Sequence, residues 1–243
     1  QAGVRLQGAN TQITSVDGDV SITGTNNSNL GAFVTSGVEI SSTGTGASAA
    51  TITITGTGAA GIDIDTAGTL VSSVVGDILL DGNANTLEGI LIADATISSA
   101  GTTADAATVT LDGSSNGAVS VQLNNGSTVT SVAGNVRLIG DSSAATANGV
   151  ELQSSSTVSS TGNGAVVASI TMMGTGGTAN DGIHIDGSIE SVNGNIQLTG
   201  VTSNADGDDE LDLDAGQIQS TGTGTILLVG NGQTNGLEID SSI

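Results

Sequence analysis

The sequence predicts an all-β protein, a parallel β-helix (β-solenoid) of about eight coils with three short strands in each coil. Three observations lead to this prediction: a repeat of about 28 residues, apolar residues spaced two apart within each repeat, and turn-forming residues between the apolar phrases. The chain has 243 residues, of which 38 are glycine and none is proline. Apolar residues nowhere keep the spacing of three and four that a helix of several turns needs.

The first phrase of the repeat reads glycine, apolar, any residue, apolar. Its copies are Gly3–Leu6, Gly61–Ile64, Gly89–Ile92, Gly149–Leu152, Gly182–Ile185 and Gly236–Ile239, with looser copies near Gly31 and Gly117 and a variant without glycine at Glu210–Leu213. Apolar side chains two apart lie on one face of a strand, so each copy predicts a short strand with one buried face.

A second and a third phrase follow in each repeat. The second centres on Ile or Val, as in Ile13–Ser15, Ile40–Ser42, Ile97–Ser99, Val129–Ser131, Val158–Ser160, Ile189–Ser191 and Ile218–Ser220. The third ends in glycine, as in Asp19–Gly24, Asp77–Gly82, Asn135–Gly140 and Asn195–Gly200, with variants at Thr51–Gly56, Thr108–Gly113, Ser169–Gly174 and Thr225–Gly230. The connecting segments are rich in Gly, Asn, Asp, Ser and Thr, which favour turns.

One repeat cannot bury enough apolar area alone, so the repeats must stack, with each strand pairing in parallel with its counterpart in the next coil. An antiparallel sandwich is the main competitor, but it needs larger side chains to fill about 10 Å between sheets. Phe33 is the only aromatic residue, which counts against it. We expect one solenoid over residues 1–243, without a cap sequence at either end, and therefore expect further coils of a longer polypeptide or head-to-tail stacking of subunits.

The composition excludes several classes of function. The 24 acidic residues outnumber two arginines and give a net charge of −22, so we expect no nucleic-acid partner and no electrostatic binding to an anionic membrane. The absence of cysteine excludes disulfides, thiolate metal sites and a cysteine nucleophile. No apolar run approaches the roughly 20 residues of a membrane-spanning helix, so we expect no membrane insertion.

Three segments carry a resemblance to a known family. Ser15–Gly24, Ser131–Gly140 and Ser191–Gly200 resemble the repeats of filamentous-haemagglutinin-like proteins and related giant bacterial surface adhesins. The resemblance implies a right-handed β-helical shaft that is exported to the cell surface. On this basis we expect a non-enzymatic, structural or adhesive segment of an extracellular fibre. Its partners would be other copies of itself, flanking coils, or a receptor or glycan on a host or cell surface.

Acidic residues occupy the outward positions of the first phrase in the last repeats. Stacking would place them about 4.8 Å apart, and like charges opposed across strands destabilise a sheet. Ca²⁺ would relieve this repulsion, since it takes several carboxylate oxygens. The predicted calcium ligands are Asp186, Asp212, Asp214, Glu238 and Asp240. The alternative is a solvated acidic face with diffuse counterions, and we expect no other cofactor.

A second acidic segment resembles the beginning of a calcium-binding loop. Asn204, Asp206 and Asp208 alternate as in such a loop, but Asp209 stands where the loop requires glycine. We interpret this segment as a polar turn.

Two other functions remain as alternatives. A polysaccharide-processing enzyme would need cations and aromatic platforms that this composition lacks. His184 lies at an outward position, and without cysteine or a second histidine it cannot form a zinc site or a triad. Ice binding would need paired threonines on nearly every coil, but the pattern of Thr51, Thr53 and Thr55 is not repeated.

The third phrase also directs apolar side chains outward. These residues are Leu79, Ile139, Met173, Leu227 and Val229. They predict either a contact surface for a neighbouring rod or domain, or scattered surface apolar residues of no functional consequence.

Overall fold

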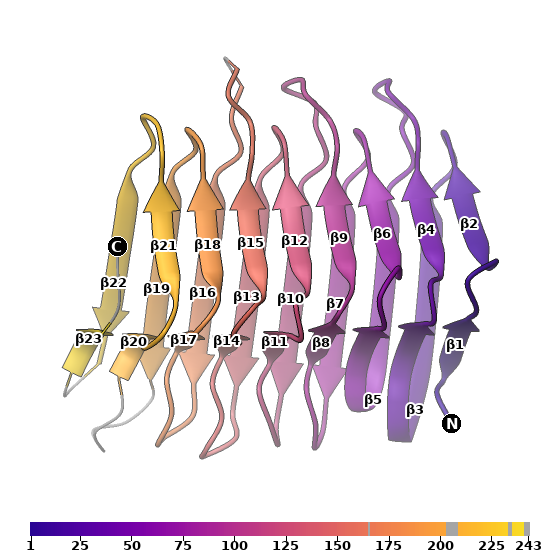
Figure 1. Ribbon diagram of the computed structural model, residues 1–243. Helices are drawn as coiled ribbons and strands as arrows, with labels where there is room; N and C mark the ends of the chain where they lie inside the picture. Colours follow the sequence, from indigo (N-terminus) through magenta and orange to yellow (C-terminus); the bar gives the residue numbers. More distant parts are fainter. Residues whose placement is uncertain (165, 203–208, 233–234, 241–243) are drawn as a thin grey trace.

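The fold is the predicted parallel β-solenoid of about eight coils. The computed structural model describes residues 1–164, 166–202, 209–232 and 235–240, and all regular structure among them is β-strand (Figure 1). No helix long and apolar enough to cross a membrane occurs in these ranges. Asn204, Asp206 and Asp208 lie outside the described residues.

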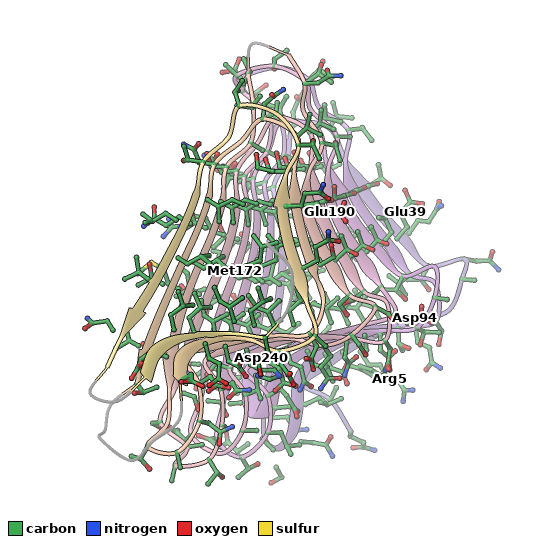
Figure 2. The ribbon with its side chains drawn as sticks, turned by 60° about the vertical axis from the view of Figure 1, so that its left-hand side comes forward. Arg5, Glu39, Asp94, Met172, Glu190 and Asp240 are labelled. Carbon is green, nitrogen blue, oxygen red and sulfur yellow. The ribbon has the colours of Figure 1, made fainter. Side chains whose placement is uncertain are left out.

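The strands form three faces that enclose the core, as the oblique view of the stack in Figure 2 shows. The first face contains β1 (Val4–Gln7), the second halves of β3 (Val20–Thr35) and β5 (Ile52–Asp65), β8 (Ile90–Ala93), β11 (Val121–Asn124), β14 (Val150–Leu152), β17 (Ile183–Ile185), β20 (Asp209–Leu213) and β23 (Asn235–Ile239). The second face contains β2 (Gln12–Ser15), β4 (Glu39–Ser42), β6 (Leu70–Ser73), β9 (Thr96–Ser99), β12 (Thr128–Ser131), β15 (Thr157–Ser160), β18 (Ser188–Ser191) and β21 (Gln217–Ser220). The third face contains the first halves of β3 and β5, β7 (Ile78–Ala84), β10 (Val109–Ser115), β13 (Val136–Ser142), β16 (Ile170–Gly176), β19 (Ile196–Thr202) and β22 (Ile226–Asn231).

Each strand pairs in parallel with its counterpart one coil away, so equivalent residues form continuous rows. The row that contains Ile54 continues through Leu80, Leu111 and Leu138, all fully buried. Met172 points into the same core (Figure 2). Burial of each such side chain is worth about 1.5–3 kcal/mol, so stacking supplies the apolar burial that one coil lacks.

A row of glycines forms the corner between the third and first faces. It runs through Gly24, Gly56, Gly82, Gly113, Gly140, Gly174, Gly200 and Gly230. A Cβ on Gly56 would lie 2.1 Å from the carbonyl oxygen of Gly61, and one on Gly140 would lie 2.0 Å from that of Gly149. The backbone therefore turns too closely at this corner for any side chain, which explains the glycine that ends the third phrase.

The looser copy of the first phrase expected near Gly117 begins three residues later. Val121 pairs with Ile90 and with Val150, so Ser120 occupies the glycine position of this coil. The prediction misplaced the copy because Ser120 replaces the glycine, whereas Gly117 belongs to the preceding turn.

The true structural unit is a pair of coils, because the turns after the second face alternate in length. Residues 16–19, 74–77, 132–135 and 192–195 form turns of four residues, whereas nine residues separate β4 from β5, β9 from β10 and β15 from β16, and five separate β21 from β22 (Figure 1). Each short turn ends in Asp or Asn, whose Oδ1 accepts a hydrogen bond from a backbone N–H of the next coil. The distances are 2.9 Å for Asp19 to Thr51, 2.8 Å for Asp77 to Thr108, and 3.0 Å for Asn135 to Ser169 and for Asn195 to Thr225.

Candidate functional site

The outward side chains in the middle of the first-face strands form one row along the whole solenoid. In order, this row contains Arg5, Phe33, Asp63, Leu91, Gln122, Glu151, His184, Asp212 and Glu238. Arg5 and Asp240, near its two ends, both lie on this face in Figure 2. Because neighbouring strands are about 4.8 Å apart, each side chain in the row interacts mainly with the residues of the adjacent coils.

His184 lies at the centre of a group of carboxylates. Its Nδ1 is 2.9 Å from Asp212 Oδ2 and 3.2 Å from Asp181 Oδ2, while its Nε2 is 3.4 Å from Asp186 Oδ2. The side chains of His184, Asp181 and Asp212 are only 22%, 14% and 20% exposed. His184 does point outward as predicted, but it is not an ordinary surface residue, because three aspartates enclose its ring.

This environment favours the protonated imidazole. The hydrogen bond to Asp181 and the negative charges of Asp212 and Asp186 raise the pKa of His184 to about 9, although burial partly opposes the shift. Burial raises the pKa of Asp212, and the imidazolium of His184 partly offsets that effect. A protonated ring therefore acts as the counter-ion of the acidic cluster at neutral pH.

The five predicted calcium ligands lie in two neighbouring rows of the last coils. Asp212 contacts His184, whereas Glu238 forms a hydrogen bond with Asp209 that, with the charges of Asp209 and Asp240, raises the pKa of Glu238 to about 7. Asp186 Oδ1 accepts a hydrogen bond from Ala215 N at 3.4 Å. Asp214 and Asp240 directly follow Leu213 and Ile239, which pair in register. Calcium binding by these five carboxylates remains a prediction.

Within the described ranges, one group of three residues has ligand atoms that all lie within 4.8 Å of one another. It consists of Asp181, His184 and Asp212, and so includes only one of the five predicted ligands. The 28-residue step from His184 to Asp212 is visible in the sequence. Asp181 was missed because it precedes the glycine of its phrase, where strand alternation does not determine the direction of a side chain.

Glu210 is a second feature that the sequence did not reveal. It replaces the glycine of the first phrase, yet its side chain is fully buried. Its Oε1 accepts a hydrogen bond from Thr202 Oγ1 at 3.0 Å, while Oε2 has no hydrogen-bond partner among the described residues. A Cβ on Gly232 would lie 1.2 Å from Oε1, so glycine at this position makes room for the carboxylate.

Two further surfaces bear on the predicted alternatives. On the third face, Met173 and Leu227 are 46% and 50% exposed, but Thr199 separates Met173 from Val229, so the apolar stripe is interrupted.

On the second face, hydroxyl side chains form two rows across three coils. They are Thr96, Thr128 and Thr157 in one row and Ser98, Thr130 and Ser159 in the other.

Because comparison with known proteins finds no match, the chain is classified by its fold alone. No protein-family model matches the chain, and no curated protein or solved structure matches it either. The internal repeat and the parallel register of the three faces nevertheless define its class. The chain is a β-solenoid repeat protein.

Proposed function

We propose that the chain is a non-enzymatic shaft segment of an extracellular or cell-surface bacterial fibre, which extends by stacking coil on coil. The observation that carries this proposal is the parallel pairing that continues from coil to coil on all three faces. Backbone hydrogen bonds between successive coils run along the stack, so tension along the fibre is shared among many bonds in parallel. A rod built in this way holds adhesive partners, such as a receptor or glycan, away from a cell.

The outermost coil supports stacking through its exposed apolar residues. Leu237 and Ile239 are 42% and 37% exposed, whereas Leu211 and Leu213 in the same rows are fully buried by the next coil. Another coil placed on this edge, from flanking sequence or from a second copy, would bury the same apolar area again and satisfy the strand edge.

The acidic surface supports the same function. A net charge of −22 keeps rods apart laterally, so association along the stack is favoured over side-by-side aggregation. The chain contains two arginines and no lysine, which leaves trypsin-like proteases few sites to cleave.

Electron microscopy and fibre diffraction of the 243-residue chain test the proposal. We expect filaments with an axial repeat of about 4.8 Å. Leu237→Asp should abolish them by placing a charge on the stacking edge, whereas Leu87→Asp, at a 48% exposed leucine in a turn, should leave them intact. Isolated short rods, or cleavage of an acidic or neutral glycan in a substrate screen, would contradict the shaft and favour a polysaccharide-processing enzyme.

The hydroxyl rows of the second face favour ice binding as a second candidate. Thr128 and Thr130 point to the same side of β12 and align with hydroxyl residues of β9 and β15. Ser159 Oγ donates to Thr130 Oγ1 at 2.9 Å, which orders part of the array. Thermal hysteresis in a freezing-point assay would support this candidate, and its absence at millimolar protein would remove it.

A further inference from the structure

Three ligand atoms from two successive coils converge beside His184. Its Nδ1 lies 2.9 Å from Asp212 Oδ2 and 3.2 Å from Asp181 Oδ2. Metal–ligand distances of about 2.0–2.2 Å place neighbouring ligand atoms of one ion about 3–3.5 Å apart. The two measured separations from Nδ1 therefore match the spacing of donors around a single ion, with only small side-chain adjustments.

The other side of the imidazole provides a second observation. Its Nε2 faces Asp186 Oδ2 at 3.4 Å, on the opposite edge of the ring from the two converging oxygens. A histidine that binds a metal usually directs its other ring N–H to a carboxylate, which fixes the tautomer and the orientation of the ring. Asp186 favours hydrogen on Nε2, so a metal ion at Nδ1 has to displace only the other proton of the imidazolium, the one directed toward Asp181 and Asp212.

The two carboxylate oxygens beside Nδ1 also favour a metal ion over a simple hydrogen bond. A single N–H on Nδ1 can align well with only one of the two carboxylate oxygens beside it, whereas a divalent ion coordinates both oxygens and the nitrogen. Asp209 adds another negative charge close enough to act on Asp212.

We propose that Asp181, His184 and Asp212 bind one divalent transition-metal ion, such as Zn²⁺, that links two successive coils. An imidazole nitrogen favours zinc and its neighbours over calcium, which prefers oxygen ligands alone. This site shares Asp212 with the calcium site predicted for the five carboxylates but differs from it in chemistry, and it does not depend on the fibre function. It also departs from the expectation that His184, without cysteine or a second histidine, cannot form a zinc site, because Asp181 and Asp212 supply the other ligands. The ion ties β17 to β20 at a point where backbone pairing and the contact between His184 and Asp212 already join the two coils.

Nuclear magnetic resonance of the full chain with isotope-labelled histidine tests the site, because His184 is the only histidine and the chain has no cysteine. Titration with ZnCl₂ should shift the Nδ1 resonance and saturate at one equivalent. Asp181→Asn and Asp212→Asn should each weaken binding at least about 10-fold, as expected when a metal site loses a supporting group. Asp105→Asn removes the same charge from an exposed turn and should change nothing.

Several results would overturn the proposal. A His184 ring that does not respond to stoichiometric zinc, or a shift at Nε2 in place of Nδ1, would exclude the proposed coordination. Equal weakening in Asp105→Asn and Asp181→Asn would show diffuse attraction of zinc to an acidic protein. Competition by equimolar CaCl₂ would assign the cluster to calcium. Circular dichroism of each variant confirms that the solenoid is folded, so a loss of binding reports on the site.

Discussion

Asp63 and Asp212 occupy the same position in their coils but have very different neighbours. Asp63 pairs with Phe33 on one side and with Leu91 on the other, whereas Asp212 lies beside His184. Burial, followed by the charges of Asp65 and Glu88, raises the pKa of Asp63 to about 7, and its Oδ1 lacks a hydrogen-bond partner among the described residues. Asp212 instead has an imidazolium as its counter-ion.

The comparison shows that coil position alone does not determine the chemistry of an outward residue. The repeat fixes which face a side chain occupies, but the residues one coil above and one coil below set its solvation and charge. Two carboxylates in one row can therefore have different effects: Asp63 destabilises its coil when it is charged, whereas Asp212 belongs to a cluster that His184 stabilises. Variants that change only the neighbour or only the carboxylate separate these effects.

The largest effect should come from His184→Gln, which removes the counter-ion of the acidic cluster. We expect a loss of about 2 kcal/mol in the free energy of unfolding at pH 6, discounted for partial exposure. Because the folded-state pKa of His184 is raised to about 9, this contribution is complete below the unfolded value of about 6.5 and is lost as the pH rises through 9. Urea unfolding with EDTA at pH 6 and pH 10 measures it.

The comparison at two pH values is its own control. If His184→Gln costs the same at pH 6 and pH 10, the histidine stabilises the solenoid by packing and not by charge. If His184→Gln leaves the free energy of unfolding unchanged at pH 6, solvent screens the repulsion among Asp181, Asp186 and Asp212 without the histidine.

A smaller effect of opposite sign should follow from Asp63→Asn. Asparagine removes the partly buried charge while keeping the shape of the side chain, so we expect a gain of about 1–2 kcal/mol at pH 8. The folded-state pKa of Asp63 is raised, so the wild-type chain loses stability as the pH rises from about 4 to about 7, and the two proteins should be equally stable at pH 3.5. Thermal unfolding across this range measures the difference, and a constant gain at every pH would contradict the charge explanation.

The fold could be predicted from the sequence because apolar residues two apart mark the side chains that face the core in each coil. Ile54 and Leu80, for example, lie one repeat apart and are both fully buried. The same spacing places His184 beside Asp212. The contribution of Asp181 was not predictable, since its backbone lies before the strand. The two-coil unit was also missed, because turns of both lengths share one composition and their boundaries become clear only from the strand ends and from the hydrogen bonds to the next coil.

The smallest effect should come from Arg5→Gln at the opposite end of the row. The guanidinium of Arg5 lies 5.3 Å from the centroid of the Phe33 ring, a cation–π contact worth about 0.5 kcal/mol at an exposed site. Arg5 is two coils from Asp63, about 10 Å away and beyond the screening length of about 8 Å at physiological salt. We therefore expect a small loss of stability in urea unfolding and an unchanged Asp63 titration by carboxyl NMR. A fall in the Asp63 pKa on removal of Arg5 is excluded by the sign of the charge, whereas a rise would mean that charges act along this row beyond the adjacent coil.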